Sequence, residues 1–198
     1  MATIDLSGLV RPQLVEATKR EDNPNLAEFR LQPLERGFGH TLGNAMRRLL
    51  LSSLRGSAVW AFRIDGVVHE HQTIEGVVED VHQIIGNLKT LTLSLPDEVE
   101  QTVLRIAKTG PGAVTAGDIV ATGGVKVVDL SHHLFTITAE RDISVELYVN
   151  KGRGYVESDS HPSDKNLPVD VVRIDAIYNP VRRANFTVAD TRVGQRTD

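Results

Sequence analysis

The sequence predicts an α+β fold with mostly antiparallel sheets and two main helices. Apolar residues recur at helical spacing in only two segments, 40–54 and 76–88. Short apolar runs bounded by turn residues fill most of the remainder, which is typical of strands in antiparallel sheets. The chain has 198 residues, 40% of them hydrophobic, and no cysteine. A chain of this size can bury a core without disulfides or a structural metal.

The first helix is predicted from His40 to Leu54. On a helical wheel, an arc of about 180° is apolar. This arc holds Leu42, Ala45, Met46, Leu49, Leu50 and Leu54. The opposite arc holds Asn44, Arg47, Arg48, Leu51 and Ser52. A leucine among arginines is typical of a solvated face or of a protein interface, and the pattern favours neither.

The second helix is predicted from Gly76 to Leu88, with Thr73 as its N-cap. Its apolar face holds Val77, Val78, Val81, Ile84, Ile85 and Leu88. Glu79, His82 and Gln83 lie on the opposite face, so this helix is expected to cover a sheet with one side only.

Two hairpins are predicted among the strands. Leu14–Thr18 and Ala27–Leu31 flank a polar turn, and Val59–Ile64 and Val67–Glu70 flank the turn dipeptide Asp65-Gly66. The further predicted strands are Thr90–Leu95, Val99–Ile106, Val125–Val128, Phe135–Thr138, Ile143–Val149, Val169–Tyr178 and Ala184–Val193. The polar segment 157–166 is predicted to be a loop.

Three glycines, Gly37, Gly39 and Gly43, precede and enter the first helix. Their spacing is one residue longer than the dinucleotide-binding fingerprint, and no Lys-Ser or Lys-Thr pair follows as in a phosphate-binding loop. We therefore predict that these glycines provide positive φ and a close approach of two chain segments, rather than a nucleotide site.

No catalytic constellation and no cofactor site is expected. His69 and His71, and the neighbouring His132 and His133, have no third metal ligand at a helical or turn spacing. We therefore expect surface histidines and no metal. No closely spaced aspartates occur that would hold two magnesium ions. The formal net charge of −4 argues against tight binding to DNA.

Neither a signal peptide nor a membrane span is indicated. The first residues lack a basic start and an apolar core of sufficient length, and no apolar run approaches the roughly 20 residues of a span. The absence of cysteine is compatible with a reducing compartment. We expect a cytoplasmic protein without membrane contact.

The segment ERGFGHTLGNAMRRLLLSS, residues 35–53, closely resembles the signature of the bacterial RNA polymerase α subunit. Further segments resemble that family in the same order along the chain: RIDGVVHEHQTIEGVVEDVHQIIGNLKTL, GPGAVTAGDI, NKGRGYV, VDVVRIDAIYNPVRR and TRVGQRTD. The resemblance extends over about residues 10–198.

This resemblance implies a dimerisation subdomain, roughly residues 1–54 and 173–198, with a second subdomain, 55–172, inserted into it. It also implies a non-catalytic scaffold within DNA-directed RNA polymerase, a nucleotidyltransferase whose chemistry belongs to the β and β′ subunits. Two α chains would pair and recruit β, and β′ would then complete the enzyme of transcription.

The resemblance also implies which residues make each contact. The β subunit would bind Phe38, Gly39, His40, Thr41, Asn44, Arg47, Arg48 and Leu51, together with a loop at about 68–78 that carries His69 and Glu70. The β′ subunit would bind near Lys89, Ile174, Asp175, Tyr178 and Val181. Dimerisation would use Leu42, Ala45, Met46, Leu49 and Leu50.

Two other functions stay open from the residues alone. One is a small metal-dependent hydrolase that uses the histidines, and the other is a stand-alone homodimeric interaction module. In the family, the region continues beyond the segment that resembles TRVGQRTD, with a strand and a long helix in the dimer interface and then a DNA-binding domain. We therefore expect this chain to dimerise weakly.

Overall fold

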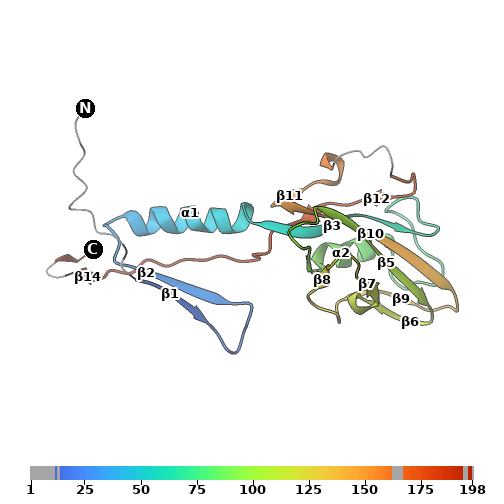
Figure 1. Cartoon of the computed structure of the whole chain (residues 1–198), viewed down its shortest axis with the longest axis horizontal. Helices are drawn as coiled ribbons and strands as arrows, with labels where there is room; N and C mark the ends of the chain where they lie inside the picture. The colour runs from blue at the N-terminus through green and yellow to red at the C-terminus, as the bar shows by residue number, and fades with distance from the viewer. Residues whose placement is uncertain (1–11, 13, 162–166, 194–195, 198) are drawn as a thin grey trace. The chain divides into compact units, whose positions relative to one another are not determined.

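The computed structural model describes residue 12 and residues 14–161, 167–193 and 196–197. The chain forms two compact units, and each is described by itself. Unit 1 comprises Met1–Leu50 and Arg183–Asp198, and unit 2 comprises Leu51–Arg182 (Figure 1). The subdomain boundaries expected from the family resemblance, at about 54/55 and 172/173, stay a prediction.

Unit 1 contains the first predicted hairpin. Strands β1 (Leu14–Lys19) and β2 (Ala27–Gln32) pair antiparallel with Ala17 opposite Phe29, so this prediction is confirmed. Helix α1 (Phe38–Ser52) begins two residues before the predicted start, and its last two residues are assigned to unit 2. Near the C-terminus, β14 (Arg192–Val193) pairs with β15 (Arg196–Thr197).

Glycines on α1 allow another segment of unit 1 to approach the helix closely. A Cβ atom on Gly43 would overlap the ring of Phe186, and one on Gly39 would lie 2.8 Å from Cγ1 of Val188. Gly37 has a positive φ of 84° in the turn before the helix. The prediction that these glycines serve conformation and close approach is therefore confirmed.

The predicted strand Ala184–Val193 is wrong over most of its length, because only Arg192 and Val193 are in a strand. The alternation of Phe186 and Val188 reflects their contact with the glycines of α1 and not a ladder with another strand. A period of two in the sequence thus identified which side chains are packed. It did not identify the type of element that carries them.

Unit 2 is built on a seven-stranded sheet in the order β7-β5-β10-β3-β4-β8, with β12 also paired to β3 (Figure 1). All the strand pairs are antiparallel. The strands are β3 (Arg55–Ile64), β4 (Leu93–Ser94), β5 (Gln101–Thr109), β7 (Ile119–Val120), β8 (Lys126–Val127), β10 (Asp142–Arg153) and β12 (Val172–Arg173).

Smaller elements complete unit 2. Strand β6 (Gly112–Thr115) pairs with β9 (His133–Ile137), and β11 (Tyr155–Val156) pairs with β13 (Ala176–Ile177). Helix α2 (Val81–Thr90) contacts both β3 and β9, and two short 3₁₀ turns lie at Ala116–Asp118 and Ser158–Ser160. The predicted α+β class, with two helices and antiparallel sheets, is confirmed.

The strand β3 is buried on both of its faces. Val59 and Phe62 belong to the large core, which also contains alternate residues of β5 and β10 and the apolar face of α2. That face consists of Val81, Ile84, Ile85 and Leu88. Ala58 and Trp60 belong to a second, smaller core with Ala176 and Tyr178. A strand with a core on each side is the central element of the unit.

The second helix begins later than predicted. Its N-cap is Asp80 and not Thr73, because Asp80 accepts the N–H of Gln83 at 2.7 Å and the side chain of Gln83 accepts the N–H of Asp80 at 3.1 Å. Gly76 has a positive φ of 75°, and Val78 is exposed. The predicted first turn is therefore a loop, and this reciprocal capping pair fixes the start.

The second predicted hairpin is also wrong. Asp65-Gly66 does form a turn, in which the N–H of Val67 bonds to the carbonyl of Ile64 at 3.0 Å, but no strand follows it. Instead, Gln72 accepts from the N–H of Val68 and donates to the carbonyl of Gly66, both at 2.9 Å. A side chain thus satisfies the backbone groups that a strand partner would have satisfied.

Most of the other predicted strands are present with shifted ends. The strand predicted at Val169–Tyr178 is two short strands, β12 and β13, and Thr90 belongs to α2 rather than to a strand. Strands β6, β7, β11 and β15 were not predicted. Within the predicted loop 157–166, residues 158–160 form a 3₁₀ turn, and residues 162–166 lie outside the described residues.

Replacing two helical glycines by alanine tests the close contact on α1. Gly43→Ala should lower the free energy of unfolding by about 1–3 kcal/mol, because its methyl group overlaps the ring of Phe186. Gly86→Ala in α2 is the matched control. It meets nothing within 4 Å and should raise stability by about 0.5–1 kcal/mol through helix propensity. Urea unfolding measures both changes.

A second substitution tests whether the loss of stability in Gly43→Ala comes from the overlap with Phe186 or from any change to α1. In the Gly43→Ala background, Phe186→Ala removes the overlapping ring, so it should cost less stability than it does alone. Additive effects of the two substitutions would contradict the contact between Gly43 and Phe186.

Candidate protein-interaction surfaces

Helix α1 offers an apolar surface that the described part of the chain leaves uncovered. None of its 15 residues is buried. Of the predicted dimerisation residues, Met46 is 48% exposed and Leu49 is 53% exposed. Ala45 is also exposed, and Leu42 and Leu50 are half-buried. Exposed apolar side chains concentrated on one helix are typical of an interaction surface.

The predicted β-binding residues of α1 also lie at the surface. Phe38, His40, Thr41, Asn44, Arg47, Arg48 and Leu51 are exposed, and Gly39 is half-buried. Because α1 exposes both its apolar and its arginine-bearing arcs, the helix can contact two partners at once.

The loop between β3 and α2 holds the other predicted β-binding residues, His69 and Glu70, both of them exposed. His71, and not His69, bonds to a neighbouring element, since its Nδ1 lies 2.8 Å from Nε2 of His82 on α2. Nε2 of His71 lies 3.5 Å from Glu70. This region is a loop, so the two imidazoles of His69 and His71 do not share a strand face.

His132 and His133 have separate structural contacts. Nε2 of His132 lies 2.9 Å from the carbonyl of Asn87 near the end of α2, and Nε2 of His133 lies 2.7 Å from Glu79. Burial favours the neutral form of Glu79, but hydrogen bonds from His133 and Thr136 outweigh it and lower the pKa of this carboxyl. Among the described residues, no group of three or more possible metal ligands occurs.

Asp175 is the centre of a polar cluster in unit 2. Its Oδ2 lies 2.9 Å from the ammonium of Lys89 on α2, and its Oδ1 accepts the N–H of Ser158 at 3.0 Å. Together with a bond from Tyr155, these contacts lower the pKa of Asp175 to about 2. We call Lys89, Tyr155, Ser158 and Asp175 the Asp175 cluster. It connects α2, β11, the 3₁₀ turn 158–160 and the segment before β13.

The predicted β′-binding residues differ in their exposure. Lys89, Asp175 and Val181 are half-buried. Ile174 and Tyr178 are each only 3% exposed, so their side chains support the surface from inside and do not lie on it. The hydroxyl of Tyr178 donates to Asn150 at 2.5 Å.

An exposed pair beside these residues was missed by the sequence analysis. Tyr155 and Ile177 lie directly opposite each other on β11 and β13 and are 58% and 47% exposed. Tyrosine next to an aliphatic side chain is a common composition of protein interfaces. The signal in the sequence was weak, because each strand has only two residues.

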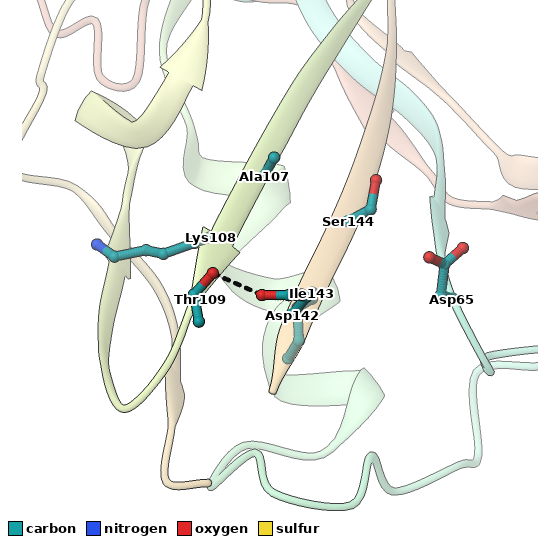
Figure 2. A pocket seen from close by; sticks show the side chains of 7 residues that line it. All are labelled: Asp65, Ala107, Lys108, Thr109, Asp142, Ile143 and Ser144. Carbon is teal, nitrogen blue, oxygen red and sulfur yellow. Dashed lines mark hydrogen bonds between the residues drawn. The ribbon is translucent and has the colours of Figure 1, made fainter. Parts of the chain in front are cut away.

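A hollow in unit 2 is lined by none of these residues. Figure 2 shows its lining, which comprises Asp65, Ala107, Lys108, Thr109, Asp142, Ile143 and Ser144. Thr109 donates to Asp142 at 2.5 Å. The ammonium of Lys108 is bound to both oxygens of Asp118 at 2.8 Å. Lys108, Thr109 and Asp142 thus already have partners, and none of the predicted site residues lines the hollow.

Comparison with known proteins identifies the family. The family model of the RNA polymerase Rpb3/RpoA insert domain matches residues 62–179. The chain belongs to this family. The proteins named DNA-directed RNA polymerase subunit alpha from Clostridium beijerinckii and Symbiobacterium thermophilum are 45% and 44% identical to it, each over 96% of the chain. The corresponding protein of Pelobacter propionicus is 42% identical, also over 96% of the chain.

The chain spans 59%, 60% and 55% of the length of these three relatives, respectively. The residues matched by the Rpb3/RpoA insert model include the loop after β3, helix α2 and the Asp175 cluster, and they exclude α1. In the described residues, neither helix has the length and apolar character that crossing a membrane requires.

The low pKa of Asp175 predicts a pH-dependent contribution to stability. The pKa is about 2 in the folded protein and 3.8 in the unfolded chain. The contribution is therefore present above about pH 4 and is lost as the pH falls through 2. Because Asp175 is partly solvated, we expect Asp175→Asn to lower the free energy of unfolding by about 1–2 kcal/mol at pH 7.

Urea unfolding between pH 7 and pH 3 measures this difference between the native protein and the variant, which should shrink below pH 4. Lys89→Met, which removes the opposite charge, is the matched variant and should make Asp175→Asn less damaging. A difference that stays constant down to pH 3 would show that Asp175 does not act through its charge.

Proposed function

We propose that this chain is the assembly region of a bacterial RNA polymerase α subunit, a non-catalytic scaffold for DNA-templated RNA synthesis. It pairs with a second α chain, recruits the β subunit and then the β′ subunit, and acts in the cytoplasm. The observation that carries the proposal is the 45% identity to a polymerase α subunit over 96% of the chain. The two large subunits supply the catalytic residues, and this chain itself needs no cofactor.

Dimerisation is supported by the apolar surfaces of unit 1. The apolar arc of α1 exposes Met46 and Leu49. The β1–β2 hairpin adds a second exposed apolar face, on which Val15 and Leu31 lie next to Ala17 and Phe29. A monomer rarely exposes apolar surface of this extent, so a second copy of the chain is the partner we propose.

Recruitment of β is supported by the remaining arc of α1. Arg47, Arg48 and Leu51 are exposed there, and arginine beside an apolar side chain is enriched at the centre of interfaces. Recruitment of β′ is supported by the Asp175 cluster and the exposed pair Tyr155 and Ile177 in unit 2. Binding of DNA by this chain alone is expected to be weak at its net charge of −4.

A stand-alone homodimeric module would use the same exposed arc of α1, so dimerisation does not distinguish it from a polymerase subunit. Binding to β does distinguish them. Tagged chain that isolates β from its own cells supports the polymerase subunit, and a homodimer that never isolates β supports the module.

Arg48→Ala should weaken binding to β while leaving the fold intact. The side chain lies outside the apolar arc, so its loss removes no core contact, but a central interface arginine contributes on the order of 2 kcal/mol. Titration of purified β by calorimetry measures the loss. Arg105→Ala is the matched control, since Arg105 is also an exposed arginine but lies on β5. Equal affinity of both variants for β would remove Arg48 from the site.

A protein of these 198 residues alone should dimerise weakly or heterogeneously, because it leaves Met46 and Leu49 exposed. Each exposed leucine or methionine forgoes roughly 1.5–3 kcal/mol of burial. Extending the chain with the corresponding relative's next strand and helix should give a tight symmetric dimer. Sedimentation over a range of concentrations measures both forms. A tight dimer or a uniform monomer of the short form would contradict the expectation.

A further inference from the structure

Among the described residues, His161 is the one polar side chain that is buried, with only 4% of its surface exposed. It directly follows the 3₁₀ turn Ser158–Ser160. Its ring lies 5.3 Å from that of Trp60 and 6.5 Å from that of Tyr178, measured between centroids. The imidazole is thus part of the smaller core on one face of β3.

Among the described residues, only one nitrogen of His161 has a hydrogen-bond partner. The ring bonds to the backbone carbonyl of Ile174, and Nε2 is buried with no hydrogen-bond partner among the described residues. Nδ1 is therefore the nitrogen that donates to Ile174, and Nε2 carries a lone pair in the neutral ring. A lone pair without a donor is tolerable here, but a proton on Nε2 would be a buried charge without an acceptor.

The charged groups around His161 do not provide an acceptor for a proton on Nε2. Burial is the main cause that lowers the pKa of His161, and the nearby cation of Arg173 lowers it further. The bond to Ile174 and the carboxylate of Asp175 act in the opposite direction. Asp175 is already bound by Lys89, Ser158 and Tyr155, so it is not available to a protonated imidazole.

The other titratable groups around the ring come from several elements. Tyr178 lies against it, Tyr148 of β10 stacks edge-on against Trp60, and Glu157 and Asp159 belong to the same segment as His161. None of these is an imidazole, the side chain that ordinarily titrates between pH 5 and 8. A change in this region within that range would therefore report on His161.

We propose that His161 is a pH-sensitive anchor that holds the segment Glu157–His161 in place when neutral and releases it when protonated. Release would uncover Trp60 and break the bond from the N–H of Ser158 to Asp175. This inference goes beyond the proposed function and needs no partner subunit.

The direction of the pH effect follows from the lowered pKa. The released segment takes up a proton near pH 6.5, the ordinary value, whereas the anchored segment resists protonation. The anchored state is therefore fully favoured above about pH 6.5 and loses its advantage as the pH falls below it. Within that window, the opening equilibrium should increase by about tenfold for each pH unit.

Amide hydrogen exchange of the whole chain, followed by NMR between pH 7.5 and pH 5, tests the proposal. The reporters are the N–H of Ser158, bound to Asp175, and the N–H of Ser160, bound to the carbonyl of Glu157. After correction for intrinsic exchange, their protection should fall by up to about tenfold per pH unit below pH 6.5. Leu147, at the centre of β10, should show no such change.

Three variants complete the test. His161→Phe fills the space between the aromatic rings without titrating, so the reporters should stay protected at every pH. His161→Ala should leave them weakly protected throughout. His82→Gln, which removes an exposed histidine of α2, should keep the pH response of the native protein.

Two results would overturn the proposal. One is protection of Ser158 and Ser160 in the native protein that does not change between pH 7.5 and pH 5. The other is a pH response that persists in His161→Phe. If that variant does not fold, the ring protons of His161 in the native chain decide, since titration at or above pH 6.5 would exclude the anchor.

Discussion

The double burial of β3 is the constraint on which unit 2 depends. Val59 and Phe62 face the large core that α2 closes, while Ala58 and Trp60 face the smaller core. The carbonyl of Trp60 also accepts the N–H of Ile174 at 2.9 Å, which places Asp175 and the short strand β13 beside this face. Because one strand supplies both cores, the Asp175 cluster and His161 are positioned by the same element that anchors the sheet. A substitution in β3 would therefore disturb the proposed β′ surface, although β3 contributes no residue to that surface.

The elements with strong periodicity could be predicted from the sequence, and those set by single side chains could not. The apolar arc of α1 and the polar turn of the β1–β2 hairpin identified these elements within two residues. The predicted start of the second helix failed because Asp80 and Gln83 cap each other. The strand predicted after Asp65-Gly66 failed because Gln72 satisfies the local backbone. These hydrogen bonds are made by common polar residues, so no sequence pattern predicts them.

The candidate surfaces, too, could be predicted from the sequence only in part. The resemblance brought Lys89 and Asp175 together, and the structure joins them in an ion pair 2.9 Å long. It also named Ile174 and Tyr178, whose side chains are buried in the described structure. The exposed pair of Tyr155 and Ile177 and the buried His161 were missed, because their neighbours come from distant parts of the chain. An apolar residue in the sequence can belong to a core or to an interface. Only its burial in the structure distinguishes the two.

Reconstitution of RNA synthesis tests the central claim, that this chain assembles a polymerase without taking part in its chemistry. Purified β and β′ subunits would be incubated with and without the chain, and template-dependent RNA synthesis would be measured for each mixture and for the chain alone. We expect no synthesis by the chain alone, little by β and β′ together, and a clear increase when all three are combined. RNA synthesis by the isolated chain, or activity of β and β′ that does not depend on it, would contradict a scaffold role for this chain.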